Sequence, residues 1–279
     1  MKNKLTLLCL LVIALVSLGV SLTKSTAIKA RFALLQGTAA PYTLDWYALE
    51  AQAQGAQQYQ FSAGIYEYAQ PDTWDDVLAG NSFIIAEPVE ARGYAEADDR
   101  GIETWYRFRI IETLSTKPVH RPLGLPPSDL APPQANEILL PRHGGTLVRN
   151  GVTLTAIDGQ FPQFVTAPPQ RYLLILDIDQ TSKVGYVWLG PLGVYRLDSA
   201  GTMTSVVVDN PYITNKRPEN NPYYQDIAER YNNSVNQLRA ALQGSPAPTP
   251  TPCQSSSLAV RRCIQRGGSW DYSTCICEY

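Results

Sequence analysis

The sequence predicts a mainly β protein, built as an antiparallel barrel or sandwich, with one long C-terminal helix and a small disulfide-rich tail module. Three observations lead to this fold class. About eight short segments rich in β-branched and aromatic residues lie between positions 82 and 208, with no amphipathic helix between them. One helical apolar stripe follows at 223–243. Four of the five cysteines fall in the last 27 residues.

The N-terminal segment 1–27 has the pattern of an export signal. Lys2 and Lys4 precede a mostly apolar run at 5–22, and Ser25-Thr26-Ala27 offers small residues to a signal peptidase. The run is also as long as a membrane span, which needs roughly 18 to 20 residues, so an uncleaved N-terminal anchor is the alternative. We expect a secreted or cell-envelope protein that meets a membrane only through this segment, where it is not cleaved.

Charge and composition bear on the class of partner. Removal of residues 1–27 takes away three lysines and no acid, which moves the formal net charge from −2 to −5. A mildly acidic chain without a basic stripe does not suit nucleic acid or an anionic membrane surface. The 16 tyrosines and five tryptophans instead favour recognition of protein or carbohydrate on aromatic surfaces.

The middle of the chain, residues 28–244, is expected to form one β-rich domain. A short helix is predicted at 44–54, where Gly55 would end it. Alternation of apolar and polar side chains at 103–114 is typical of a half-buried strand, and the acidic turn 96–101 would join it to the preceding strand as a hairpin. The predicted strands are 82–91, 103–114, 137–140, 146–157, 171–178, 185–189, 193–197 and 202–208.

A single helix is predicted at 223–243. Asn220 or Asn221 can cap its start, Pro222 suits its first turn, and Gly244 can end it. Apolar residues recur at intervals of three or four, so we expect one stripe that packs on the β domain. The stripe consists of Tyr224, Ile227, Tyr231, Val235, Leu238 and Leu242.

A Pro/Thr linker at 245–252 separates this domain from a four-cysteine module at 253–279. So short a module cannot bury enough apolar surface to fold on hydrophobicity alone, and needs disulfides or a metal. A helix is predicted at 257–265, followed by a hairpin made by 269–271 and 274–279. The expected disulfide cysteines are Cys253, Cys263, Cys275 and Cys277.

Geometry disfavours a bridge between Cys275 and Cys277, since a strand points both side chains the same way. Two patterns remain: 253–275 with 263–277, or 253–277 with 263–275. Disulfides are favoured over zinc because the module has no Cys-x-x-Cys knuckle and follows an export signal. The helix, Gly pair and Cys-x-Cys strand resemble a reduced cysteine-stabilised αβ scaffold, although Ala259 stands where such scaffolds carry a second helical cysteine.

Two short strings resemble catalytic motifs. Leu140–Thr146 resembles the Arg-His-Gly signature of histidine phosphatases and would make His143 the phosphorylated residue, but no second histidine follows it. Leu173–Thr181 resembles the first motif of haloacid-dehalogenase-like phosphatases. That resemblance implies Asp177 as nucleophile, Asp179 as acid/base and a magnesium ion, yet the chain continues into a strand and turn where that family has a helix.

Other catalytic signatures are absent from the sequence. There is no Gly-x-Ser-x-Gly elbow, no Gly-rich nucleotide loop and no cysteine in the middle domain. We therefore expect no cofactor and no metal, and favour a binding protein over an enzyme. The leading hypothesis is an exported non-enzymatic binding or structural protein of the cell surface, which recognises protein or glycan. The alternative is a secreted phosphatase- or glycosidase-like hydrolase that uses acidic residues.

The strand order over 82–197 resembles oligonucleotide/oligosaccharide-binding (OB) barrels. It is similar, more narrowly, to the netrin or tissue-inhibitor-like branch and to uncharacterised secreted bacterial β proteins. The segments that carry the resemblance are 83–91, 105–114, 137–140 and 171–176. Inhibitors of that branch depend on an N-terminal cysteine clamp that this chain lacks, so the resemblance implies a barrel but not protease inhibition.

Overall fold

The computed structural model describes residues 25–34, 36–63, 73–117, 125–159, 161, 163–187, 189–209, 222–244, 269–271 and 276–278. Contacts divide the chain into two compact units. Unit 1 has Met1–Tyr66, Glu90–Arg107 and Leu139–Gly159, and unit 2 has Glu67–Val89, Phe108–Ile138 and Gln160–Tyr279.

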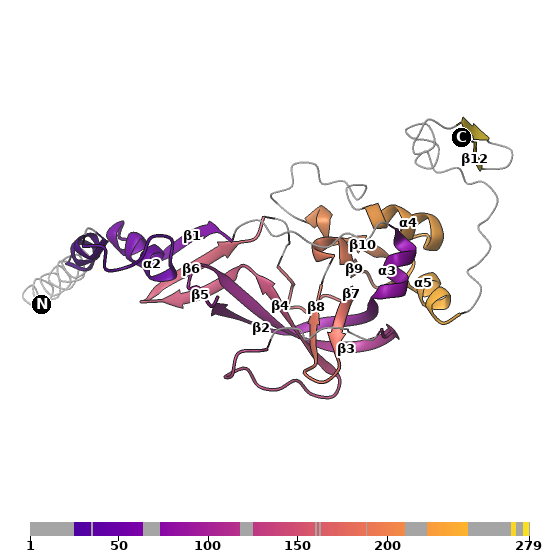
Figure 1. Cartoon of the computed structure of the whole chain (residues 1–279), viewed down its shortest axis with the longest axis horizontal. Helices are drawn as coiled ribbons and strands as arrows, with labels where there is room; N and C mark the ends of the chain where they lie inside the picture. Colours follow the sequence, from indigo (N-terminus) through magenta and orange to yellow (C-terminus); the bar gives the residue numbers. More distant parts are fainter. Residues whose placement is uncertain are drawn as a thin grey trace, which may run out of the picture. The chain divides into compact units, whose positions relative to one another are not determined.

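The strands form three sheets (Figure 1). In the three-stranded sheet the order is β1 (Gln58–Ser62), β6 (Val152–Ile157) and β5 (Gly145–Arg149). In the seven-stranded sheet it is β10 (Met203–Ser205), β9 (Val194–Leu197), β7 (Tyr172–Asp179), β2 (Ser82–Ala95), β3 (Ile102–Ser115), β4 (Glu137–His143) and β8 (Val184–Tyr186). Because β7 also pairs with β8, five of these strands close into a barrel. The predicted mainly β fold with a barrel is confirmed.

The helices are short. They are α2 (Leu44–Ala53), α3 (Trp74–Gly80), α4 (Pro222–Tyr231) and α5 (Val235–Leu242), and residues 25–34 are also helical. Two 3₁₀ turns, η1 (Gly190–Gly193) and η2 (Val206–Asp209), flank β9 and β10. α2 confirms the helix predicted at 44–54, whereas α3 and β1 were not predicted.

In unit 2, Trp74 anchors the helices to the sheet. Its ring is almost fully buried, it lies edge-on to Phe83 of β2, and its indole N–H donates to the hydroxyl of Tyr231 at 3.2 Å. An ion pair joins the same helices at the surface, where Arg230 of α4 reaches Asp75 in the first turn of α3. Burial of the apolar side chains supplies most of the stabilisation, and the surface ion pairs add little.

The predicted apolar stripe of the C-terminal region is confirmed. Its side chains join the core that also contains Trp74 and residues of β2, β7 and β9. Ile227, Tyr231, Val235 and Leu238 are buried, and Tyr224 and Leu242 pack against them.

The prediction of a single helix at 223–243 is wrong, because this segment forms two helices, α4 and α5. Asn232 and Asn233 lie between the two helices with φ angles of 48° and 54°. Asparagine tolerates this left-handed conformation better than most residues, which allows the helix to stop there. The break lets Ser234 form a β-bridge with Thr202, so the stripe stays on one core although the helix does not continue.

The prediction of one continuous strand at 146–157 is also wrong, because the segment folds into a hairpin of β5 and β6. Asn150 and Gly151 form its tip, with φ angles of 51° and 76°. Two consecutive positive φ angles are the requirement of the tight hairpin turn that Asn-Gly favours. Asn150-Gly151 is therefore a turn signal within a segment whose apolar and polar residues otherwise alternate as in one strand.

In unit 1, α2 packs across one face of the three-stranded sheet. Parallel pairing sets Tyr59 opposite Leu154 and Phe61 opposite Ala156, so these side chains share the face that α2 covers. The helical residues 25–34 meet the other end of α2, where Arg31 Nε donates to the carbonyl of Ala53 at 3.0 Å.

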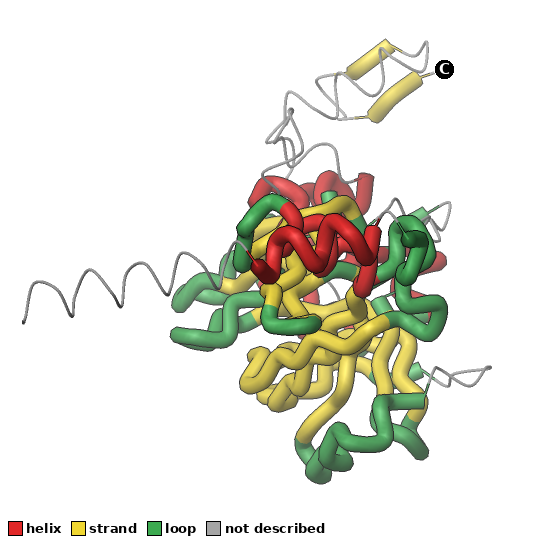
Figure 2. The backbone as a smooth tube through the Cα atoms, turned by 90° about the vertical axis from the view of Figure 1, so that its left-hand side faces the viewer, coloured by secondary structure: helices red, strands yellow, loops and turns green. Residues whose placement is uncertain are grey.

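The predicted hairpin of the tail is present as β11 (Ser269–Asp271) and β12 (Ile276–Glu278), which pair antiparallel (Figure 2). Cys277 lies in β12 opposite Trp270. Cys253, Cys263 and Cys275, the linker 245–252 and residues 1–24 lie outside the described residues. The disulfides and the export signal therefore stay predictions. Among the described helices, none has the length and hydropathy needed to cross a membrane.

The break between α4 and α5 predicts an asymmetry between two substitutions of the exposed Asn232. Asn232→Ala should lower the free energy of unfolding by about 1 kcal/mol, because a Cβ-bearing residue without a polar side chain disfavours positive φ. Asn232→Gly should leave it within about 0.5 kcal/mol, because glycine adopts this conformation readily. Urea unfolding of both variants checks this, and equal losses would contradict it.

Candidate ligand-binding site

The N-terminus of α2 is fixed by its cap. Thr43 is the N-cap residue, and its hydroxyl accepts from the backbone N–H of Trp46 at 3.3 Å while donating to the carbonyl of Ala40 at 2.7 Å. The backbone N–H of Leu44 donates to the carbonyl of Asp99 at 2.8 Å, in the turn between β2 and β3. Backbone N–H groups at the start of the helix are thus satisfied, and the helix begins at a defined place.

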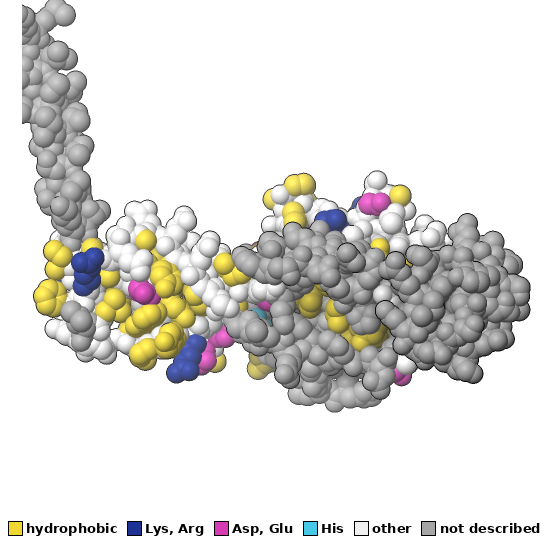
Figure 3. Space-filling model, turned by 90° about the horizontal axis from the view of Figure 1, so that it is seen from above, with side chains coloured by type: hydrophobic (Ala, Val, Ile, Leu, Met, Phe, Trp, Pro, Cys, Tyr) yellow, Lys and Arg dark blue, Asp and Glu magenta, His cyan; other side chains and the backbone are white. Residues whose placement is uncertain are grey.

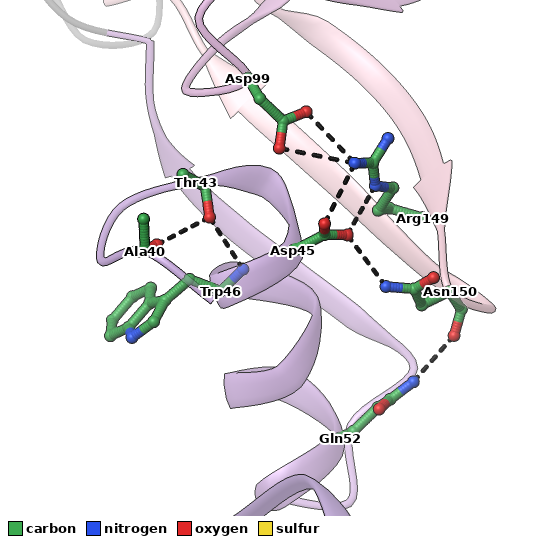
Figure 4. Close-up of polar contacts among 8 residues, drawn as sticks. All are labelled: Ala40, Thr43, Asp45, Trp46, Gln52, Asp99, Arg149 and Asn150. Carbon is green, nitrogen blue, oxygen red and sulfur yellow. Dashed lines mark hydrogen bonds and ion pairs between the residues drawn. The ribbon is translucent and has the colours of Figure 1, made fainter. Parts of the chain in front are cut away.

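Arg149 of β5 ties α2 to the hairpin beneath it (Figure 4). Its guanidinium makes two bonds to the carboxylate of Asp45, at 2.8 and 3.2 Å, and a longer one to Asp99 at 3.5 Å. Asn150 Nδ2 donates to the same Asp45 carboxylate at 3.1 Å, and Gln52 reaches the Asn150 carbonyl at 2.8 Å. The hydrogen bond from Arg149 holds the pKa of Asp45 below its usual range.

This anchored helix carries a set of aromatic rings in mutual contact, here called the aromatic strip. It consists of Tyr42 from the turn before α2, Trp46 and Tyr47 from the first turn of α2, and Tyr59 and Phe61 from β1. Ring centroids are 5.5 Å apart for Tyr42 and Trp46 and 5.3 Å for Trp46 and Tyr47. Tyr47 lies 5.5 Å from Tyr59 and stacks on Phe61 at 4.2 Å.

The strip is partly open to solvent, since Tyr47, Tyr59 and Phe61 also pack against the apolar cluster beneath α2. Tyr42 is 65% exposed, and the other four side chains are half-buried. Hydrophobic side chains gather on one face of unit 1, with polar surface around them (left half of Figure 3). Aromatic rings left in contact with water in this way are enriched where proteins bind ligands.

The backbone at Tyr42 has an unusual conformation. Its φ of 62° is in the left-handed region, which a bulky aromatic residue seldom adopts. The cap of Thr43 on Ala40 closes the preceding turn and holds Tyr42 out beside Trp46. Strain of this kind persists where surrounding contacts impose it, and it concentrates at functional sites.

Polar groups border the strip. The hydroxyl of Tyr59 donates to the Glu50 carboxylate at 2.8 Å. Burial, together with this carboxylate, raises the pKa of Tyr59 to about 12, so its hydroxyl stays protonated. The side chains of Gln58 and Gln60 are exposed on the opposite face of β1. The strip therefore offers ring faces with a carboxylate close by.

A second group of side chains in unit 1, here called the Glu103 cluster, contains His143. His143 Nδ1 lies 2.8 Å from Glu96 Oε1, and the Trp105 indole donates to Glu103 at 2.6 Å. Burial raises the pKa of Glu103 and the charge of Glu96 adds to the rise, while Trp105 and His143 oppose it. Arg142, the neighbour of His143 in the phosphatase-like string, is instead buried against Asp158 at 3.5 Å.

Asp177 and Asp179 belong to β7 in unit 2. Asp177 is opposite Tyr186 in the antiparallel pairing with β8, so no helix follows the motif. Asp179 accepts from the Ser182 hydroxyl at 2.7 Å and from the backbone N–H of Thr181 at 2.8 Å, and these bonds hold its pKa below the usual range. It serves as a turn cap.

Across the described part of the chain, no three His, Cys, Asp or Glu side chains form a group that could hold a metal ion. Comparison with known proteins gives no relative, because no family model, curated protein or solved structure matches the chain. The resemblance to OB and netrin-like barrels therefore rests on the strand pattern alone.

The raised pKa of Glu103 predicts that Glu103→Gln increases the stability of the folded chain, by an amount that depends on pH. Between the unfolded pKa near 4.5 and the higher folded value, the folded chain binds more protons than the unfolded chain, so stability falls as pH rises. Glutamine cannot ionise and can still accept from Trp105. The variant should be more stable than the parent at about pH 7, with the gain vanishing at about pH 4.

Urea unfolding at both pH values measures this difference, with Glu229→Gln on the exposed side of α4 as the charge-matched control. A gain equal at both pH values, or larger in acid, would show that ionisation of Glu103 is not costly in the folded chain.

Proposed function

We propose that this chain is an exported, non-enzymatic binding protein of the cell surface or envelope, and that the aromatic strip holds a glycan. The observation that carries the proposal is Tyr42, an exposed ring kept at positive φ in contact with Trp46. A tyrosine whose role was to pack in the core would be buried, and Tyr42 is exposed. A tyrosine without a role would not be expected at a position with an unfavourable positive φ. The N-terminal signal pattern and the cysteine-rich tail support export.

A glycan suits the strip better than a purely apolar ligand. Pyranose rings have one face of C–H groups, which packs on aromatic rings, and a rim of hydroxyl groups, which needs acceptors and donors. The rings of Tyr42 and Trp46 are tilted by 45° with their centroids 5.5 Å apart, so together they form one apolar surface for the C–H face of a sugar. The Glu50 carboxylate beside Tyr59 offers an acceptor to the hydroxyl rim.

The alternative function, a glycan hydrolase, is favoured by the Glu103 cluster. Glycosidases use two carboxyl groups whose pKa values are set apart by their surroundings. Glu103 has a raised pKa, and Glu96 lies close enough to contribute to it. Trp105, the ring that donates to Glu103, is buried, whereas the rings of the strip are exposed or half-buried.

The proposal predicts that the rings at the start of α2 carry affinity. Tyr42→Ala and Trp46→Ala should each weaken binding of chito- or cello-oligosaccharides about tenfold or more, as expected for an aromatic residue at the centre of a binding surface. Tyr42→Phe keeps the ring and should bind nearly as the parent does. Isothermal titration of the full chain with soluble oligosaccharides measures these affinities.

Three outcomes would count against it. Unchanged affinity in both alanine variants would remove the strip from the site. Binding of a protein ligand but of no oligosaccharide would change the class of partner. New reducing ends that appear with the parent and not with Glu103→Gln would favour the hydrolase.

A further inference from the structure

The helix at 25–34 turns its large apolar side chains outward. Ile28 is 54% exposed and Phe32 is 60% exposed, whereas Ala30 is buried at 2%. Residues four apart lie on one face of a helix, so Ile28 and Phe32 share the outer face and Ala30 lies on the inner face. A helix on the surface of a protein in water normally has the reverse arrangement, with its apolar stripe toward the core.

Hydrogen bonds hold the helix in this orientation. Arg31 Nε donates to the carbonyl of Ala53 at 3.0 Å, which ties the helix to the end of α2. Gly37, with a φ of 64°, ends the helix in the left-handed conformation typical of a C-terminal cap. The N–H and the hydroxyl of Thr38 both donate to the carbonyl of Ala33, at 3.2 and 2.8 Å. These contacts fix which face of the helix points outward.

The chain before this helix indicates what lies on the outer face. The run at 5–22 has no charged residue and has the length that a membrane span needs, roughly 18 to 20 residues. Only Thr23 and Lys24 separate it from the helix, and two residues reach at most about 7 Å. A chain that enters a bilayer through this run therefore has the start of the helix at the membrane surface.

We propose that the run at 5–22 is retained as a membrane anchor and that Ile28 and Phe32 insert into the interfacial region of the same bilayer. Helices that lie in this region bury their apolar face between headgroups and acyl chains. Lys29, exposed on the same side, can reach the headgroups with its ammonium group while its methylene chain stays on apolar surface. Because apolar side chains make the contact, it needs no anionic lipid.

The position of the predicted cleavage site favours retention of the run. Ser25-Thr26-Ala27 forms the first turn of the helix, whereas proteolysis concentrates in exposed irregular segments. Cleavage after Ala27 would remove this turn and leave Ile28 as the first residue. With the run retained, unit 1 and its aromatic strip are held close to the membrane surface, whether or not a glycan binds.

A photoreactive residue on the outer face tests the contact. The full chain is made with p-benzoylphenylalanine at position 32 and reconstituted into phosphatidylcholine vesicles that contain a radioactive lipid tracer. The probe replaces an exposed ring, so the fold should tolerate it. Irradiation should attach at least about ten times more lipid than it does with the same probe at the exposed position 60 of β1, because only the helix face inserts.

A second substitution shows whether the two side chains insert together. Ile28→Glu should lower lipid labelling from position 32 about fivefold or more, because a carboxylate disfavours the apolar side of the interface. Ile28→Leu should label as the parent does. Gln60→Glu adds the same charge at an exposed position away from the helix and should also leave the labelling unchanged.

Four results would overturn the proposal. Labelling at position 32 could be no stronger than at position 60, or it could be unaffected by Ile28→Glu. Cross-links from position 32 to protein and not to lipid would assign the face to a protein partner. An exported chain whose intact mass begins at Ile28 would show that the anchor is removed. None of these results bears on oligosaccharide affinity, which is measured by titration.

Discussion

The ion pair between Asp45 and Arg149 is the contact on which the candidate site depends. Its two bonds join the first turn of α2 to the tip of the β5–β6 hairpin, and Asn150 and Asp99 complete the network. An isolated pair of this exposure would be worth about 1 kcal/mol or less. Here it acts with the Leu44 N–H bond to Asp99, so the helix is held at a defined position over the sheet.

The two units are stabilised by different means. Unit 2 has a large apolar core around Trp74, supplied by the barrel strands, α3, α4 and α5. Among the described residues, the apolar cluster beneath α2 in unit 1 has seven buried members, and the bonds from Arg149 and Asn150 to Asp45 help to position the helix over it. Unit 1 also contains the strained Tyr42 and the Glu103 cluster. The features that suggest function are therefore concentrated in unit 1.

The barrel was predictable because its strands alternate strongly and end at clear turn residues. The apolar stripe of α4 and α5 was predictable for the same reason, but the break at Asn232 was not, since stripe periodicity continues across it. His143 could be singled out from its motif, whereas its neighbour Glu96 lies 47 residues away in sequence and no local pattern joins them. The aromatic strip could not be predicted from a local pattern, because tertiary packing brings Trp46 of α2 and Phe61 of β1 to the same ring, Tyr47. The alternation of Gln-Tyr-Gln-Phe-Ser was the one local signal for β1.

The most direct test of the account is the response of the tryptophan indoles to ligand. In the full chain, labelled with ¹⁵N and titrated with a chito-oligosaccharide, the indole N–H resonance of Trp46 should shift, as assigned with a Trp46→Phe variant. The resonance of Trp74, buried against Tyr231, should stay in place. Binding that leaves Trp46 unchanged, or that shifts Trp105 in the Glu103 cluster instead, would contradict the aromatic strip as the site.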